Sequence, residues 1–232
     1  YKRFVIIESL FSAGYSMPSY TLLGSRIIPL PFILNTSLAH EILHQWFGNS
    51  VYVDHSFGNW SEGLTAYLAD HYYAEQENKD IQYRKNLIAN YLAYTSPKHI
   101  MPVHQFKAAG SKKVRAVGYG KVSMIFHELR KLYGDEKFFS AIQHFYQQNK
   151  LNKASWHDLQ KSFDLISSKP LYSFFQDQLT RTDLVKINIE KAAEIYLDDG
   201  KPWLKFELSQ KDIAPNSPYH LHLDLHLNYS NK

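Results

Sequence analysis

The chain has 232 residues, of which 44% are hydrophobic and 15% aromatic, and its formal net charge at pH 7 is +4. This length suits one large globular domain, or one domain with an appendage. Basic residues are scattered along the chain except in the cluster Lys112–Arg115, which we interpret as a solvated loop. Because a nucleic-acid-binding protein needs a basic stripe, we expect no nucleic-acid partner.

The chain contains no cysteine, so disulfides and Cys₄ metal sites are excluded and the redox compartment stays open. It also lacks a run of about 18 apolar residues, which excludes a membrane-spanning helix. The first residue is Tyr1 rather than Met, which indicates a fragment or a processed chain. We therefore expect a soluble protein from which the flanking domains of a longer chain are missing.

Two strands are predicted near the N-terminus. One is a buried strand over Phe4–Leu10, and the other covers Tyr20–Ile28 after a turn at Gly14–Ser19. Pro29 and Pro31 then interrupt the chain before a helix begins.

Capping and terminating residues predict the next two helices. The first helix ends at Gly48 and begins after one of three candidate caps, which are Asn35, Thr36 and Ser37. The second is capped by Ser61 and runs to about Glu77. A short extended segment, Val51–Val53, lies between them.

From there to about Leu179 the apolar residues recur at helical spacing. We expect Asp135 and Ser155 to cap two of the helices and Pro170 to open the last one. The expected buried stripes are Leu87, Ile88, Tyr91 and Leu92; Val122, Ile125, Phe126, Leu129 and Leu132; and Phe138, Phe139, Ile142, Phe145 and Tyr146.

The composition changes at Thr180–Asp183. Residues 185–190, Trp203–Leu208 and His220–Leu227 alternate between apolar and polar side chains, which predicts a small antiparallel unit with one buried face. We interpret the alternating histidines of the last segment as solvated. The fold class predicted is therefore α+β and mainly α, with one domain over residues 1–182 and a β-rich segment over 183–232.

The first helix carries the motif His40-Glu41-Ile42-Leu43-His44. Residues four apart lie on the same face of a helix, so His40 and His44 present two imidazoles side by side. Glu62, after seventeen intervening residues, lies at the start of the second helix and can supply a third ligand. Two histidines and a glutamate with an open fourth position make a catalytic zinc site, and Glu41 is the natural general base. The alternative is an amphipathic helix with two surface histidines, but its apolar neighbours argue that the motif is buried.

The segments His40–Asn49 and Glu62–Leu68 resemble the gluzincin aminopeptidases, the group that contains alanyl aminopeptidase and leukotriene hydrolase. The family typically has one more residue between the second histidine and the glutamate, so a loop residue is missing within Tyr52–Trp60. Tyr119-Gly120-Lys121 is similar to the family's Tyr-x-Lys-Gly segment. Leu132–Phe139 is similar to its helix break. The likeness covers roughly Gly14 to Leu179, ending in the helical segment that begins at Leu171.

The resemblance implies a thermolysin-like zinc peptidase domain with a helical subdomain, followed by the beginning of a β-sandwich domain. It implies one zinc ion per chain, held by His40, His44 and Glu62. It also implies that Tyr119 donates a hydrogen bond to the oxyanion of the tetrahedral intermediate, opposite Glu41. A neutral phenol suits this role, because it is protonated at neutral pH and its hydrogen bond strengthens as the oxygen becomes charged.

One family element is missing. The family has a Gly-x-Met-Glu-Asn strand whose glutamate binds the free amino group of a peptide, whereas this chain reads Gly14-Tyr15-Ser16-Met17-Pro18. If Met17 corresponds to the family methionine, Pro18 replaces the glutamate. Glu8 and Asp54 are the other carboxylates considered for its role.

We therefore predict a zinc-dependent hydrolase that cleaves peptide bonds and whose preference for amino-terminal residues is open. Two alternatives remain. One is a hydrolase of a small non-peptide substrate, and the other is a catalytically weak metal-binding interaction module.

Overall fold

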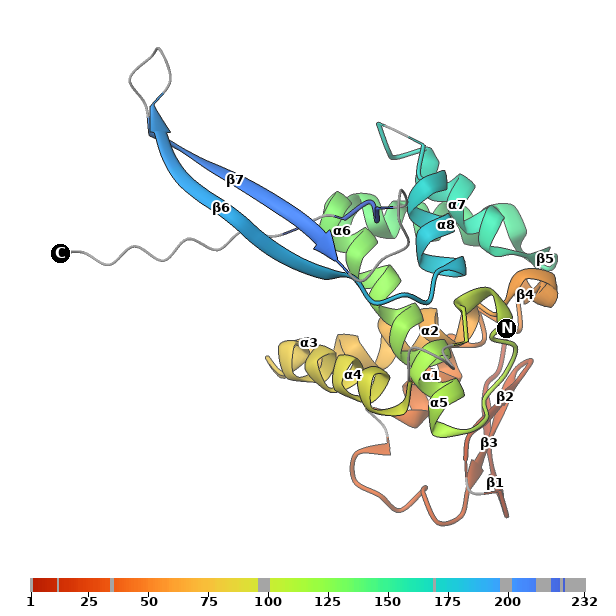
Figure 1. Ribbon diagram of the computed structural model, residues 1–232. Helices are drawn as coiled ribbons and strands as arrows, with labels where there is room; N and C mark the ends of the chain where they lie inside the picture. Colours follow the sequence, from red (N-terminus) through yellow and green to blue (C-terminus); the bar gives the residue numbers. More distant parts are fainter. Residues whose placement is uncertain are drawn as a thin grey trace. The chain divides into compact units, whose positions relative to one another are not determined.

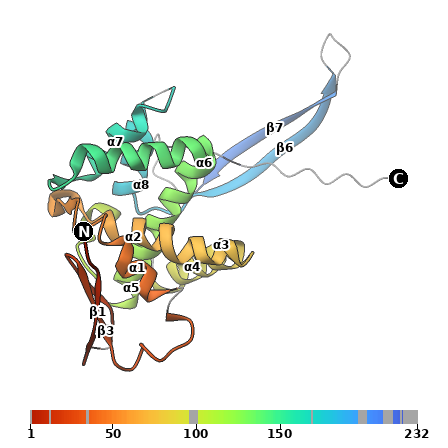
Figure 2. The ribbon, with the colours of Figure 1, turned by 180° about the vertical axis from the view of Figure 1, so that it is seen from behind.

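The computed structural model describes residues 2–11, 13–33, 36–95, 101–168, 170–196, 202–211, 218–221 and 223. The chain divides into two compact units, Tyr1–Thr180 and Arg181–Lys232. The division falls inside the composition change noted in the sequence, two residues before the expected boundary. The α+β, mainly helical fold is confirmed, while the assignment of the second unit to a β-sandwich stays a prediction (Figures 1 and 2).

The first unit begins with a small sheet of three strands, β1 (Val5–Ser9), β2 (Tyr15–Met17) and β3 (Tyr20–Gly24). Their order is β1-β3-β2, with β1 parallel and β2 antiparallel to β3. Both predicted strands therefore form, but part of the expected turn is the strand β2. The expectation that the first strand is buried is wrong, because β1 is an edge strand and Val5, Ile6 and Ile7 are exposed.

Two helical segments at the centre of the unit follow this sheet. Helix α1 covers Ser37–Leu43 and continues in turns to Phe47. The helix predicted from Ser61 to about Glu77 is confirmed, and it consists of α2 (Ser61–Ala66), a π-helical turn η3 (Tyr67–His71) and α3 (Tyr72–Gln76). Between them lie β4 (Tyr52–Val53) and the 3-10 turn η2 (His55–Phe57).

The predicted cap of the second helix is wrong, whereas one of the three candidate caps of the first helix is confirmed in position. Ser61 is the first residue of α2 rather than its cap, and its hydroxyl donates instead to the backbone oxygen of Phe47 at 2.5 Å. Thr36 occupies the cap position of α1 without a capping hydrogen bond, and the candidate cap Asn35 lies outside the described residues. The polar side chains at these helix starts therefore hold neighbouring segments rather than the helix ends.

The rest of the first unit is helical. Its elements are α4 (Asp80–Tyr94), the 3-10 turn η4 (Val103–Gln105), α5 (Lys112–Arg115), the π-helical turn η5 (Ala116–Lys121), α6 (Val122–Asn149), β5 (Lys153–Ala154), α7 (Trp156–Asp164) and α8 (Tyr172–Thr180). Strand β5 pairs in parallel with β4 and thereby links α7 to the loop before α2. Ser155 is the N-cap of α7, as expected, and its backbone N–H donates to Asp158 at 2.9 Å.

Helix α6 provides the main core. Its first stripe is buried as predicted except for Leu132, which is half-buried, and a break occurs at Gly134, where φ is 76°. In the second stripe Phe139 is exposed, contrary to expectation, whereas its neighbour Phe138 is buried. The buried core gathers side chains from both halves of α6 and from α2, α7 and α8, including Trp60, Leu64, Phe126, Phe138, Phe145, Trp156, Phe163 and Phe175.

Two further expectations about this unit fail. The stripe on α4 is not buried, and Ile88 and Leu92 are exposed, because α4 packs against the chain mainly through η5. The basic cluster Lys112–Arg115 is the helix α5 rather than a loop, and Ser111 is its N-cap. Among the described residues, no helix is long and apolar enough to cross a membrane.

The second unit contains the antiparallel pair β6 (Lys186–Tyr196) and β7 (Pro202–Lys211), with an irregularity between Ile189 and Lys191. The predicted antiparallel segment is therefore confirmed for two of its three strands. The described part of the third, His220, Leu221 and Leu223, is not a strand, and the rest lies outside the described residues. The expected buried face is wrong, because apolar side chains of both strands are exposed, namely Ile187, Ile189, Trp203, Leu204 and Leu208.

The π-helical turn η5 yields a test of this packing. A Cβ atom at Gly118 would lie 2.1 Å from the ring of Phe106, which is fully buried, whereas a Cβ at Gly120 would meet nothing nearer than a backbone oxygen at 3.8 Å. We predict that Gly118→Ala lowers the free energy of unfolding by about 1–3 kcal/mol through overpacking. Gly120→Ala, the matched control, should be neutral or stabilising by up to about 1 kcal/mol. Urea unfolding of both variants checks this, and equal stabilities would contradict it.

Candidate metal centre

The three residues proposed to bind zinc come from two helices of the first unit. His40 lies on α1, His44 is the residue that ends it, and Glu62 lies in the first turn of α2. His40, Glu41 and His44 are 8–9% exposed, so these polar groups need partners inside the protein. The expectation of a buried motif is met, although Trp46, one of the apolar neighbours behind that expectation, is 45% exposed.

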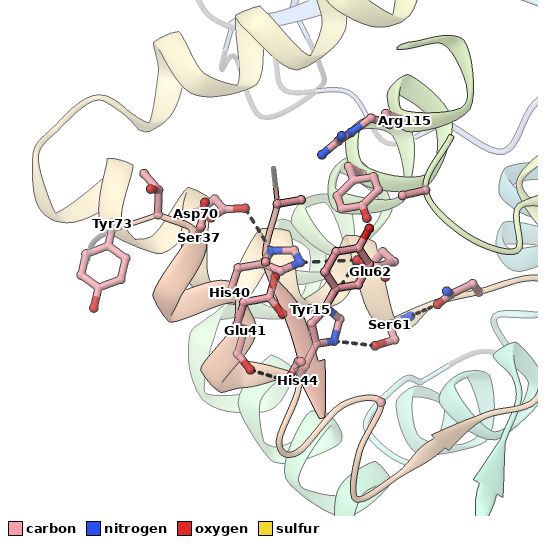
Figure 3. A pocket seen from close by; sticks show the side chains of 18 of the residues that line it. Tyr15, Ser37, His40, Glu41, His44, Ser61, Glu62, Asp70, Tyr73 and Arg115 are labelled. Carbon is pink, nitrogen blue, oxygen red and sulfur yellow. Dashed lines mark hydrogen bonds and ion pairs between the residues drawn. The ribbon is translucent and has the colours of Figure 1, made fainter. Parts of the chain in front are cut away.

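The structure brings the three candidate ligands together (Figure 3). Glu62 Oε2 lies 3.4 Å from Nε2 of His40 and 3.4 Å from Nε2 of His44. All three ligand atoms lie within 4.8 Å of one another. A tetrahedral ion with bonds of 2.0–2.1 Å holds its ligand atoms about 3.3–3.4 Å apart, so the spacing fits zinc.

The Nδ1 atoms of both histidines, which face away from Glu62, lie within hydrogen-bond distance of oxygen atoms. His40 Nδ1 lies 3.2 Å from Oδ2 of Asp70, and His44 Nδ1 lies 2.9 Å from the backbone oxygen of Phe47. Each acceptor favours a proton on Nδ1 and leaves the lone pair on Nε2, which faces Glu62. Both imidazoles are thus oriented for a metal ion by groups outside the ligand set.

The charges around His40 also suit a cation. Burial alone would lower the pKa of His40, but hydrogen bonds and charges from Asp70 and Glu62 outweigh it and raise the pKa to about 10. Burial alone would raise the pKa of Glu62, but hydrogen bonds and charges from His40 and His44 outweigh it and keep this pKa below its ordinary value. Surroundings that stabilise a positive charge at this point stabilise a divalent ion equally, and its binding would release a proton from His40.

Glu41 lies beside the ligands without belonging to their cluster. Burial raises its pKa above the ordinary value for a glutamate, against the opposing charges of His44 and His40. A Cβ atom at Gly14 would lie 2.4 Å from Glu41 Oε1, so a side chain at position 14 would force the carboxylate to move. Gly14 therefore contributes to the site through its missing side chain.

Strand β2 is fastened to the helix that carries the motif. Ser16 Oγ donates to the backbone oxygen of Glu41 at 2.8 Å and accepts from the amides of Gln45 at 2.9 Å and Asn49 at 3.0 Å. Gln45 also accepts from the backbone N–H of Ser19 at 2.7 Å. The strand that forms one wall of the site is therefore positioned by buried hydrogen bonds to α1 and the turn after it.

The structure bears on the missing glutamate of this strand. Gly14, Tyr15 and Ser16 line the cleft above the cluster, while Pro18 lies outside the cleft lining and is exposed in the turn after β2. Glu8 and Asp54 are not part of the cleft lining either. Among the described residues, this segment brings no carboxylate into the cleft.

Tyr119 lies beside His40 in the cleft lining. It belongs to η5, which joins α5 to the start of α6 in one helical run that continues to the break at Gly134. Its ring stacks on that of His40, with centroids 6.0 Å apart and planes 22° apart. Burial and the neighbouring Glu62 raise the pKa of Tyr119 above its ordinary value, so the phenol keeps its proton at neutral pH.

The cluster opens into a cleft of about 1360 Å³. Two of its residues were missed by the sequence reasoning, Asp70 and Arg115. Asp70 lies two helical turns after Glu62 and was detectable from the helical period. Arg115 was treated as part of a solvated cluster, and only its position four residues before Tyr119 pointed to the site.

The family model of the peptidase family M1 domain matches residues 34–178, which is more than half of the chain. The chain belongs to peptidase family M1. The resemblance to gluzincin aminopeptidases is thereby confirmed, and members of this family are zinc enzymes.

Two curated relatives show how far the sequence of this chain has diverged. Aminopeptidase N of Lactococcus lactis is 25% identical over 203 residues, covering 78% of this chain and 23% of the relative. Mitochondrial aminopeptidase 2 of Saccharomyces cerevisiae is 24% identical over 230 residues, covering 89% of this chain and 23% of the relative. The chain thus spans about a quarter of the length of these relatives.

Solved M1 structures share the fold. An M1 zinc metallopeptidase from Deinococcus radiodurans, bound to a Tyr-Ser-Ala substrate, matches with a TM-score of 0.60 and 18% identity, over 76% of this chain and 39% of the other. Yeast leukotriene A4 hydrolase matches with a TM-score of 0.58 and 15% identity, over 78% of this chain and 32% of the other. These likenesses agree with the expected peptidase architecture of the first unit.

The ligand assignment leads to a prediction about metal content. We expect wild-type protein to bind one zinc ion and the double variant His40→Ala, His44→Ala to bind none, because a single carboxylate does not hold the ion. His157→Ala, which removes an exposed histidine on α7, is the matched control and should keep the metal. Metal analysis of dialysed protein checks this, and stoichiometric zinc in the double variant would disprove the site.

Proposed function

We propose that this chain is the catalytic part of a zinc-dependent peptide hydrolase, with His40, His44 and Glu62 as the ligands of one zinc ion. The observation that carries the proposal is the spacing of the three ligand atoms, with both histidine–glutamate distances at 3.4 Å. Zinc bound there would polarise the attacking water and the scissile carbonyl. Membership of family M1 supports the peptide substrate.

Glu41 is the general base. Its carboxylate accepts a proton from the attacking water and then gives that proton to the nitrogen of the leaving amine. A general base works best when its pKa approaches the working pH, and burial shifts the pKa of Glu41 in that direction.

Tyr119 is the oxyanion donor. Its phenol is protonated at neutral pH, and its ring stacks on that of His40. The hydrogen bond from its hydroxyl strengthens as negative charge develops on the former carbonyl oxygen, so it favours the transition state over the substrate.

We predict that Glu41→Gln retains zinc but loses hydrolysis, because an amide cannot accept the proton of the water. The rate on an internally quenched peptide should fall at least about 10²–10⁴-fold. Glu77→Gln is the matched control, because Glu77 lines the same cleft but pairs with Lys79 at 2.7 Å. Hydrolysis by Glu41→Gln at the wild-type rate would remove Glu41 from the role of base.

The same assay separates this proposal from its alternatives. Because the β2 segment places no carboxylate in the cleft, a free amino terminus adds little binding energy to a peptide. Wild type should therefore cleave an acetylated peptide and its free form at similar rates. Cleavage of the free form alone would show that another group binds the substrate's ammonium. No cleavage of any peptide by zinc-loaded protein would favour a non-peptide substrate or a metal-binding module.

We further predict that Tyr119→Phe folds and binds zinc like wild type but turns over about 10²–10³-fold more slowly, the typical effect of one lost oxyanion donor. The loss should appear in kcat rather than in KM, because the hydrogen bond matters only as charge develops. Tyr73→Phe, which also alters a tyrosine of the cleft lining, is the control. An unchanged kcat in Tyr119→Phe would assign this tyrosine to packing.

A further inference from the structure

The acidic side chains of the cleft are already engaged. Besides the motif glutamate and Glu62, the cleft is lined by Asp70, which pairs with His40 at 3.2 Å, and Glu77, which pairs with Lys79 at 2.7 Å. Within the described part of the chain, the cleft therefore presents no additional uncommitted carboxylate. A substrate cation finds no ready partner there.

The lysine and arginine side chains of the cleft lining differ among themselves, and Lys79 is the one already paired with Glu77. Lys107 donates to the backbone oxygen of His55. Arg115 is exposed on the cleft lining, and none of the carboxylates that the structure describes forms an ion pair with it. A guanidinium without a carboxylate partner gives this wall of the cleft a positive charge that a ligand can use.

Arg115 is also held in place. It lies on α5, one helical turn before Tyr119, and its guanidinium carbon lies 5.3 Å from the centre of the Tyr119 ring. Figure 3 shows the guanidinium directed toward the space above His40 and Asp70. Stacking on an aromatic face orients the planar group while leaving its N–H donors available, so less side-chain freedom is lost when a ligand binds.

We propose that Arg115 binds a carboxylate of the peptide substrate and thereby determines which peptides this cleft accepts. This inference rests on the function proposed above. The carboxylate is either the C-terminal group of a short peptide or an Asp or Glu side chain, because both offer the same two oxygens to the guanidinium fork.

The geometry limits where this carboxylate lies in the substrate. Two successive ring contacts, of 5.3 Å and 6.0 Å, lead from the Arg115 guanidinium through Tyr119 to His40. These two contacts set an upper limit on the separation of the guanidinium from the His40 ring, and an extended peptide advances about 3.3–3.6 Å per residue, so the carboxylate lies within about three residues of the scissile bond. Longer separations would carry it past Arg115.

The test uses three quenched peptides of one sequence. The reference has Asn two residues from the cleavage point and an amidated C-terminus. The second restores only the C-terminal carboxylate, and the third replaces only that Asn by Asp. Wild type, Arg115→Met and Lys113→Met are compared. Lys113→Met removes an equal charge from the same helix at a residue that does not line the cleft.

We expect wild type and Lys113→Met to favour at least one carboxylate peptide over the reference by about ten- to a hundredfold in kcat/KM, mainly through KM. Arg115→Met should bring this ratio to about one. The peptide that shows the preference identifies the source of the carboxylate. A preference that is absent in wild type, or that survives in Arg115→Met, overturns the proposal. So does equal slowing of all three peptides, which would mean that Arg115 acts only through Tyr119.

A binding measurement tests the role of Arg115 independently of whether the chain hydrolyses peptides. Calorimetric titration of the zinc-loaded Glu41→Gln variant, with and without Arg115→Met, measures the affinity for each peptide without turnover. Tighter binding of a carboxylate peptide that depends on Arg115 supports the inference even if no peptide is cleaved. Equal affinities for all three peptides overturn it even if the wild type proves to be a peptide hydrolase.

Discussion

The buried pairing of His40 with two carboxylates is the constraint on which the rest of the site depends. Two imidazoles and three acidic groups share a small volume in the first unit, where unpaired charges would be costly. Asp70 and Glu62 lie on one helical run and bracket the ring of His40 from two sides. The helix containing the motif is therefore fixed against α2 and η3 by charge as well as by packing.

The walls of the cleft come from segments far apart in the chain, and each is tied to this centre. Ser16 fastens β2 to the motif helix and the turn after it by three hydrogen bonds, and Gly14 lets the strand approach Glu41. The π-helical turn η5 brings Tyr119 onto His40, and Gly118 allows this turn to pack against Phe106. Two glycines thus set the distances across which the proposed chemistry works.

The part of the site that could be predicted from sequence is the part encoded locally. The spacing of His40 and His44 follows from the helical period, and the capping of α7 by Ser155 follows from neighbouring residues. The roles of Gly14 and Ser16 could not be predicted, because they depend on which strand lies beside α1. The predictions that the α4 stripe and strand β1 are buried failed for the same reason. Apolar periodicity does not say whether another segment covers the apolar face.

Two π-helical turns, η3 and η5, coincide with Asp70 and Tyr119. A π-turn amounts to one extra residue in an α-helix, and such turns are frequent at functional sites. Deleting one residue from η5 would let the helix close into regular α-helical form and rotate the residues before it by about 100° relative to the rest of the helix. The side chains of Tyr119 and Arg115 would then no longer both point into the cleft, while the core side chains of α6 would keep their positions. Val117, which lies in the core, and Gly118, which packs on Phe106, would rotate with them, so the direction of the cleft residues and the packing of this helix depend on the same extra residue.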